Sequence, residues 1–268
     1  MADRQFNEVS FYVVAHADDW QLFMNPNAYY DMLNEKNKVV IIITTAGDAG
    51  KKDLYWQARE EGCKSSVRYC LAPHFIIKER CGTRSMNSHK ISFWEANNVY
   101  CYFLRLPDGN LDGSGFPNTF HFSLSKLKSH SIISMPALDQ SALYRDWEDF
   151  YFTLNELIIY ESQGLSKIYI NYLDPDVTHQ DHADHTATGC AVQAMDFFGK
   201  TEHVIFSGYE CNSPKPISSF DLFWKVGMLA AYEKAVFDKS GYSTLKEGIP
   251  QYLEWCLRRS SFKKLYFM

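Results

Sequence analysis

The sequence predicts an α/β protein of the Rossmann-like type, in which a mostly parallel sheet carries helices on both faces. Short runs rich in β-branched and aromatic residues alternate with longer stretches of helical periodicity, as in successive βαβ units. The run VVIIITT at 39–45 is nearly continuous in apolar and β-branched residues, which is typical of a strand buried on both faces. Hydrophobic residues make up 46% of the 268 residues, without a linker or repeat, so we expect one domain spanning 1–268.

The first part of the chain predicts strands and helices in strict alternation, the pattern of right-handed crossover units. AGDAG, between two of these elements, predicts a loop. The expected elements are a strand at 9–15, a helix at 20–37, a strand at 39–45, a loop at 46–50, a helix at 55–72 and a strand at 74–78.

The rest of the chain continues this alternation after a less regular middle. Residues 111–150 contain glycines, a proline and an ambiguous stretch at 123–140, and we expect them to form the rim of a pocket. The other expected elements are a strand at 98–106, a helix at 147–164, a strand at 167–173, a helix from about 184, a strand at 203–210, a helix at 221–237, a terminal helix near 248–259 and a solvated basic stretch at 258–264.

Composition excludes several classes of protein. The net charge of -5 argues against a nucleic-acid binder, and no apolar run reaches the roughly 18 residues of a membrane span. Seven scattered cysteines without a CxxC pair, and the absence of an apolar signal core at the N-terminus, predict a cytoplasmic protein. Aromatic residues reach 16%, which favours a tyrosine-rich core and leaves a ring-lined sugar cleft as the alternative. Homo-oligomerisation is compatible with the sequence.

Two clusters of histidine and aspartate follow predicted strands. AHADDW occupies 15–20, and DVTHQDHADH occupies 176–185. The carboxyl ends of parallel strands meet at one edge of a sheet, so both clusters are expected to face one crevice. His16 and Asp19 are three residues apart and would share one side of a helical turn, while Asp18 would point elsewhere. His182 and His185 have the same spacing at a helix start, where the helix dipole disfavours imidazolium.

Neutral imidazoles and a carboxylate at one crevice suit a metal ion. Two histidines and one aspartate fit Zn²⁺, with a fourth position left for water, as in catalytic zinc sites. Zinc lowers the pKa of such a water to roughly 7, and Asp18 is the nearby carboxylate that could accept its proton. Each cluster alone could instead form caps and turns. The occurrence of both at strand ends favours the metal.

These motifs resemble the PIG-L/LmbE-like family of zinc-dependent N-deacetylases. The family's AHPDDE appears here as AHADDW, with Ala17 for proline and Trp20 for glutamate. Its HxDH motif, followed by small residues and a glycine, fits HADH at 182–185 better than the overlapping HQDH at 179–182. The stretches from TAGDAG to YWQARE (45–60) and LRLPDG (104–109) resemble a bacterial-type branch. The resemblance implies the same α/β fold, with the zinc site at the carboxyl ends of the strands.

The resemblance also implies roles for individual residues. His16, Asp19 and His185 would hold Zn²⁺, although another divalent ion such as Fe²⁺ is compatible with these ligands. Asp18 would be the general base, and His182 would stabilise the oxyanion.

Three further residues take supporting roles under the same resemblance. Asp184 would orient a neighbouring histidine, and Arg59 would reach the substrate. Asp48, in TAGDAG, would either line the crevice and contact substrate or hold its own loop. The loss of the motif's glutamate at Trp20 removes no metal ligand.

The sequence therefore predicts a zinc-dependent N-deacetylase. Its substrate would be a small molecule containing an N-acetylated sugar, such as an N-acetylglucosamine derivative. Two alternatives stay open: a two-metal phosphoester hydrolase, since clusters of this kind also hold metal pairs, and a non-catalytic metal-containing binding protein of the same fold. Metal counting and an acetate-release assay separate the three.

Overall fold

An eight-stranded mixed sheet forms the centre of the protein in this computed structural model, which describes residues 5–176, 178, 180–195, 201–210 and 216–267. The strand order is β10-β9-β8-β1-β2-β5-β4-β3. The strands are β1 (Glu8–Val14), β2 (Asn37–Thr45), β3 (Glu79–Met86), β4 (His89–Ala96), β5 (Val99–Leu106), β8 (Lys167–Leu173), β9 (Thr201–Phe206) and β10 (Phe262–Phe267). The five neighbours β9, β8, β1, β2 and β5 are parallel, so the expected mostly parallel α/β fold is confirmed.

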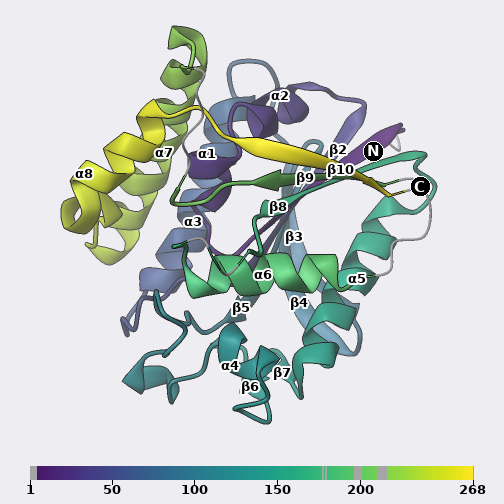
Figure 1. The fold of residues 1–268 in the computed structure, drawn as a ribbon. Coiled ribbons are helices and arrows are strands. Elements are labelled where there is room, and N and C mark those ends of the chain that lie inside the picture. The colour runs from purple at the N-terminus through teal and green to yellow at the C-terminus, as the bar shows by residue number, and fades with distance from the viewer. Residues whose placement is uncertain (1–4, 177, 179, 196–200, 211–215, 268) are drawn as a thin grey trace.

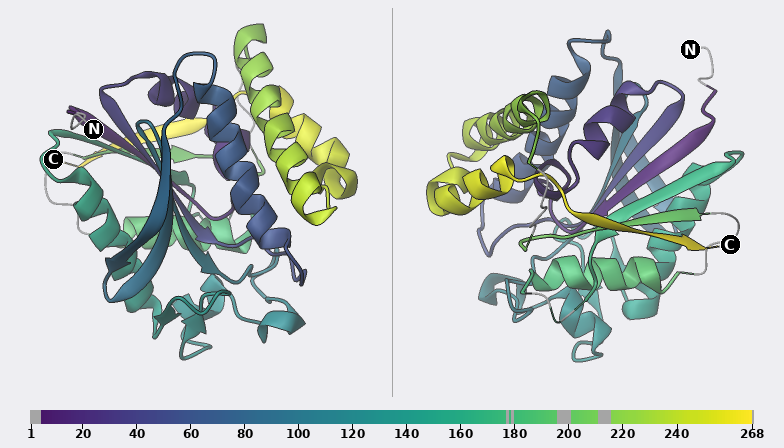
Figure 2. Two further views of the ribbon diagram at one scale, coloured as in Figure 1. Left: turned by 180° about the vertical axis from the view of Figure 1, so that it is seen from behind. Right: turned by 45° about the horizontal axis from the view of Figure 1, so that its top comes forward.

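Helices cover both faces of the sheet (Figures 1 and 2). The helices are α1 (Asp19–Phe23), α2 (Asn27–Leu33), α3 (Tyr55–Leu71), α4 (Leu124–Lys128), α5 (Trp147–Ser162), α6 (Ala183–Gln193), α7 (Ser219–Ser240) and α8 (Thr244–Leu257). In Figure 2, α3, α7 and α8 lie on one side of the sheet, and α5 and α6 lie on the other. Among the described residues, no helix combines the length and apolar character needed to cross a bilayer.

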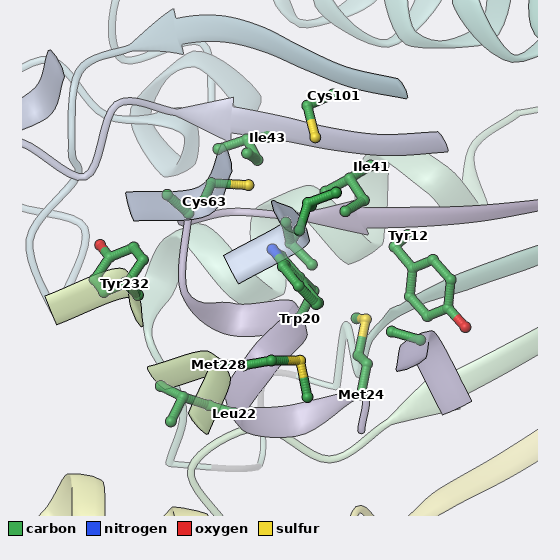
Figure 3. Packing of buried hydrophobic residues seen from close by; sticks show 14 of the residues in the cluster. Tyr12, Trp20, Leu22, Met24, Ile41, Ile43, Cys63, Cys101, Met228 and Tyr232 are labelled. Carbon is green, nitrogen blue, oxygen red and sulfur yellow. The ribbon is translucent and has the colours of Figure 1, made fainter. Parts of the chain in front are cut away.

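The alternation of side chains along β1 divides the core into two layers. Phe11 and Val13 belong to the cluster under α5 and α6, whereas Tyr12 and Val14 belong to the cluster under α3 and α7. Trp20 is fully buried in this second cluster, among the residues drawn in Figure 3. The residue in place of the family's glutamate is therefore part of the core.

Two expectations about elements were wrong. The helix expected at 20–37 is split into α1 and α2, because Pro26 lacks the N–H that a continuous helix needs. The strand expected at 74–78 begins only at Glu79, where β3 and β4 form an antiparallel hairpin. The stretch 258–264 includes the start of β10, which pairs with β9, while Lys263 and Lys264 are exposed as expected of a solvated face.

The middle segment 111–150 packs on the α6 side of the sheet. It contains a 3-10 helix at Pro117–Thr119, α4 and the two-residue strands β6 (Met135–Pro136) and β7 (Leu143–Tyr144). Leu124, Leu127 and Met135 are buried in the same apolar cluster as α5 and α6. The segment thus contributes to the main core.

Candidate metal centre

Parallel pairing of β1 with β8 brings the two predicted clusters together. Val13 of β1 lies opposite Tyr172 of β8, so the chain leaves both strands at the same edge of the sheet. The first cluster continues into α1, and the second leads into α6. His16, Asp19, His182 and His185 are all buried there. The expectation that they share one crevice is met.

His16, Asp19 and His185 form a compact group of potential metal ligands. His16 Nδ1 lies 3.2 Å from His185 Nε2, and Asp19 Oδ1 lies 3.1 Å from the same Nε2. Asp19 Oδ1 lies 3.6 Å from His16 Nδ1. The second oxygen, Asp19 Oδ2, accepts the backbone N–H of His16 at 2.7 Å, which fixes the carboxylate. Three lone-pair donors therefore converge on one buried point.

A carboxylate stands behind each of the two histidines. Asp184 Oδ2 lies 3.5 Å from His16 Nε2, and Asp181 Oδ1 lies 2.8 Å from His185 Nδ1. The Asp181 contact holds a proton on Nδ1 of His185 and leaves Nε2 free for a metal, whereas the longer Asp184 contact favours the charged form of His16. Asp184 lies beside His16, and its expected orienting role stays a prediction. Asp181 was missed by sequence reasoning, although it precedes His185 by the four residues of one helical turn.

The charges of this group favour a cation. Burial lowers the pKa of His185, but Asp19 and Asp181 outweigh it and bring the pKa to about 10. Burial also acts to lower the pKa of His16, yet the carboxylates around it raise the pKa well above its usual value. Conversely, the pKa of Asp19 lies well below the usual value despite burial, because both histidines stabilise its charge. A divalent metal would meet the same demand for positive charge, and the N, N, O donors suit zinc.

A second group of potential ligands shares the ring of His16. It consists of His16, Asp108, His182 and Asp184. Two of its members already have partners: Asp184 Oδ2 accepts the Gly109 N–H at 2.8 Å, and His182 Nδ1 accepts the Asp184 N–H at 3.1 Å. The first group, whose inner atoms face one another, is therefore the better candidate for a metal.

His182 is held as a neutral hydrogen-bond donor. Its Nδ1 accepts the backbone N–H of Asp184, so the ring proton of the neutral form lies on Nε2. Burial, together with the nearby charge of His16, lowers the pKa of His182 to about 4. The Nε2–H group lies 3.7 Å from Asp108 Oδ1 and borders the same cavity. Asp108 was missed from the sequence, although it follows β5 in the stretch LRLPDG.

Asp18 forms a buried ion pair with Arg59. The distance from Arg59 Nη2 to Asp18 Oδ1 is 2.5 Å, and Tyr252 donates its hydroxyl to Asp18 Oδ2 at 3.2 Å. Burial would lower the pKa of Arg59, but the charge of Asp18 keeps it well above the usual value. The expected contact of Arg59 with substrate stays a prediction, since the guanidinium here holds Asp18.

The candidate ligands border a cavity of about 120 Å³. Its far walls include Tyr209, Tyr252 and Trp255, which no sequence pattern identified. Tyr209 and Trp255 stack with their ring centroids 4.5 Å apart. The cavity is lined by His16, Asp18, Asp19, Leu22, Phe23, Arg59, Asp108, His182, Tyr209, Tyr252 and Trp255. Since 111–150 supplies none of these described residues, its role as a pocket rim stays a prediction.

Asp48 lies behind the cavity and supports the loop that carries Asp108. Its carboxylate accepts the N–H groups of Asp108 at 2.8 Å and Gly50 at 3.2 Å. This is the loop-holding alternative considered for Asp48, and contact with substrate stays a prediction. His179, the first residue of the competing HQDH motif, lies outside the described residues. His185, which only the HADH register assigns to the metal, is the histidine that faces Asp19.

Comparisons with known proteins found a matching family model and a similar solved structure. The family model described as PIG-L, GlcNAc-PI de-N-acetylase, matches residues 11–195. No curated protein sequence matches the chain significantly. One similar solved structure is GalB, the 4-carboxy-2-hydroxymuconate hydratase from Pseudomonas putida KT2440. That match has a TM-score of 0.46 and 8% identity, and covers 97% of each chain.

Proposed function

Because the chain belongs to the PIG-L family of GlcNAc-PI de-N-acetylases, we propose that it is a metal-dependent hydrolase that removes an N-acetyl group from a sugar-containing small molecule. The convergence of His16, Asp19 and His185 on one buried point is the observation that carries the proposal. These residues would hold Zn²⁺ or a similar divalent ion such as Fe²⁺. When bound, such an ion supplies Lewis acidity and lowers the pKa of water.

Asp18 is the proposed general base. A carboxylate offers about four lone-pair positions, and the contacts with Arg59 and Tyr252 use two of them. The remaining positions can accept a proton from the attacking water and return it to the leaving amine. The two contacts fix the orientation of the carboxylate, so the base needs little reorganisation during the reaction.

His182 is the proposed donor to the oxyanion. The attack on the acetyl carbonyl places negative charge on the carbonyl oxygen, and a preoriented N–H group stabilises that charge. The neutral ring directs its proton on Nε2 toward the cavity side, because Nδ1 is occupied by the Asp184 N–H. Acetate and a free amine are the products.

The size and walls of the cavity support a small acyl group. The volume of about 120 Å³ is below the roughly 300 Å³ at which pockets for whole small-molecule ligands begin. Leu22, Phe23 and Trp255 provide apolar surface beside the polar residues. An acetyl group would therefore enter the cavity, and the sugar would extend toward its mouth. The cysteines within the described residues are free thiols, in keeping with the cytoplasmic location we propose.

Metal content and acetate release test the proposal. The purified wild-type protein should contain about one equivalent of divalent metal and release acetate from at least one member of a panel of N-acetylated glycosides. His185→Ala should lose most of the metal and the activity, whereas the exposed His74→Ala serves as the matched control. Unchanged metal content in His185→Ala would contradict the ligand assignment.

The same experiment separates the alternatives. Two equivalents of metal together with phosphoester cleavage would favour the two-metal hydrolase. Metal binding without release of acetate or phosphate from any tested compound would favour the non-catalytic binding protein.

A further inference from the structure

A second cavity lies on the sheet at the end opposite the candidate metal centre. Its volume is about 350 Å³, and it lies over β1, β8, β9 and β10 beside α2. Glu8, at the start of β1, borders it, whereas His16 follows the other end of the same seven-residue strand. Tyr12 also borders it, so at about 3.3 Å per residue the two cavities are roughly 13 Å apart along the chain at their nearest residues. We call this second cavity the N-terminal groove.

Strand register explains the floor of the N-terminal groove. One row of cross-strand neighbours is Ser10, Tyr169 and Glu202, and the next row is Tyr12, Asn171, Val204 and Lys264. Residues two apart on a strand share a face, so both rows point to the same side. Farther along this face, Val14, Leu173 and Phe206 are apolar and covered. This face of the sheet is therefore apolar where helices cover it and polar beyond them.

The polar floor is buried and does not form an open sheet surface. Ser10 and Asn37 are each 2% exposed, and Asn171 is 4% exposed. An uncovered, solvated face would leave such side chains in contact with water. Burying a polar group is unfavourable unless it forms a hydrogen bond. The hydrogen bonds of these side chains therefore show which donors and acceptors of the groove still have no partner.

Several polar side chains that line the groove donate to partners within the protein. Asn37 Nδ2 donates to Ser10 Oγ at 3.0 Å. Tyr12 donates its hydroxyl to Asp31 Oδ2 at 2.7 Å, and Asn171 Nδ2 donates to the Phe11 carbonyl at 2.9 Å. By contrast, the acceptor Asn37 Oδ1 is buried and has no partner. A hydrogen-bond donor on a ligand would complement this acceptor.

The residues that line the groove carry an excess of negative charge. Three carboxylates, Glu8, Asp31 and Glu202, border it, and Lys264 is the cation among the residues that line it. Lys264 is paired with Glu202, which leaves the negative charge of Glu8 and Asp31 in excess. Among the described residues, these carboxylates do not come close enough together to form a metal-ligand group. Their spread suits an organic cation better than a metal ion.

We propose that the N-terminal groove binds a primary ammonium group carried on a small polar molecule. The ammonium supplies three N–H donors, which suit the free lone pair of Asn37 and the carboxylate of Asp31. The rings of Tyr30 and Tyr169 line the groove and provide the aromatic surface that attracts cations. The inference rests on this groove alone and holds whether or not the protein is a deacetylase. Amino sugars and short diamines both carry this chemistry.

Calorimetric titration of the full-length, metal-containing protein tests the inference. The probes are glucosamine, putrescine and, as the uncharged counterpart of the first, glucose. At least one amine should bind saturably, and glucose should bind at least about tenfold more weakly, since a charge-assisted hydrogen bond is lost. The amine that binds more tightly identifies the source of the ammonium group.

Three variants locate the binding site. Asp31→Asn should weaken amine binding at least about tenfold, and Glu8→Gln, at a half-buried position where misfolding is not expected, should weaken it several-fold. Asp238→Asn, which removes an exposed carboxylate from α7, should leave binding unchanged. The inference is wrong if neither amine saturates, if glucose binds equally well, or if Asp31→Asn and Glu8→Gln both bind as the wild type does.

Discussion

Asp18→Asn separates the catalytic role of Asp18 from its structural role. The substitution keeps the shape of the side chain and removes its charge and basicity. Loss of a general base typically lowers the rate about 10²–10⁴-fold, so kcat for acetate release should fall within that range. Metal content should stay unchanged, because Asp18 faces Arg59 and Tyr252, whereas Asp19 faces His16 and His185.

The ion pair with Arg59 adds a cost in stability to the same substitution. Arg59 is 7% exposed, and its Nη2 lies 2.5 Å from Asp18 Oδ1. Removing one partner of a buried ion pair leaves the other charge unpaired and typically costs about 3–5 kcal/mol. Urea unfolding should show a loss of this order for Asp18→Asn. A lower rate in the single variant would therefore have two explanations, partial unfolding and loss of the base.

Arg59→Met removes the unpaired charge of Arg59, so it separates partial unfolding from loss of the base. Replacing both partners of a buried pair is often nearly neutral, so the double variant Asp18→Asn/Arg59→Met should recover most of the lost stability. Its kcat should nevertheless stay about 10²–10⁴-fold below that of the single variant Arg59→Met. Equal turnover in these two proteins, both with full metal content, would show that Asp18 only holds Arg59. The proposed mechanism would then lack its base.

Three further changes probe the surroundings of the centre. His182→Ala should retain the metal, as measured by elemental analysis. Its kcat should fall about 10²–10³-fold, the usual effect of losing an oxyanion donor. Loss of the metal would instead identify His182 as a ligand. The pKa of His185 is raised to about 10 in the metal-free protein, above roughly 6.5 in an unfolded chain. Its stabilising contribution is therefore full below pH ~6.5 and lost as pH rises toward 10. Metal-free wild type should lose stability over this window, and His185→Ala should lose less, because the raised pKa of His16 remains. Gly189→Ala should destabilise the protein by about 1–3 kcal/mol and weaken metal binding, because the added Cβ would lie 2.4 Å from the Leu173 carbonyl oxygen. Unfolding curves and metal titrations that match those of the wild type would contradict this prediction.

The parallel strands of the sheet could be predicted because burial on both faces demands apolar residues. β2 is buried along almost its whole length, and its sequence NKVVIIITT shows this directly. The hairpin of β3 and β4 escaped prediction for the opposite reason. β3 is mostly exposed and contains Glu79, Arg80 and Arg84, so its pattern resembles a loop and its pairing depends on its neighbour.

The inner residues of the candidate centre could be predicted because they follow strand ends in short motifs. His16 and Asp19 are close in sequence, and His182 and His185 are equally close. The supporting contacts connect distant parts of the chain. Tyr252 bonds to Asp18 across 234 positions, and no local pattern reports such a contact.

The boundary of the family match has a consequence for substrate selection. The match ends at residue 195, after all the proposed ligands and the proposed base. Tyr209, Tyr252 and Trp255, which form the aromatic wall of the cavity, all come later in the chain. A motif thus identifies the part of the site that would perform the hydrolysis, because that chemistry needs fixed donors at fixed spacings. We expect the choice among acylated substrates to depend on the later residues, whose shape and packing no short motif encodes.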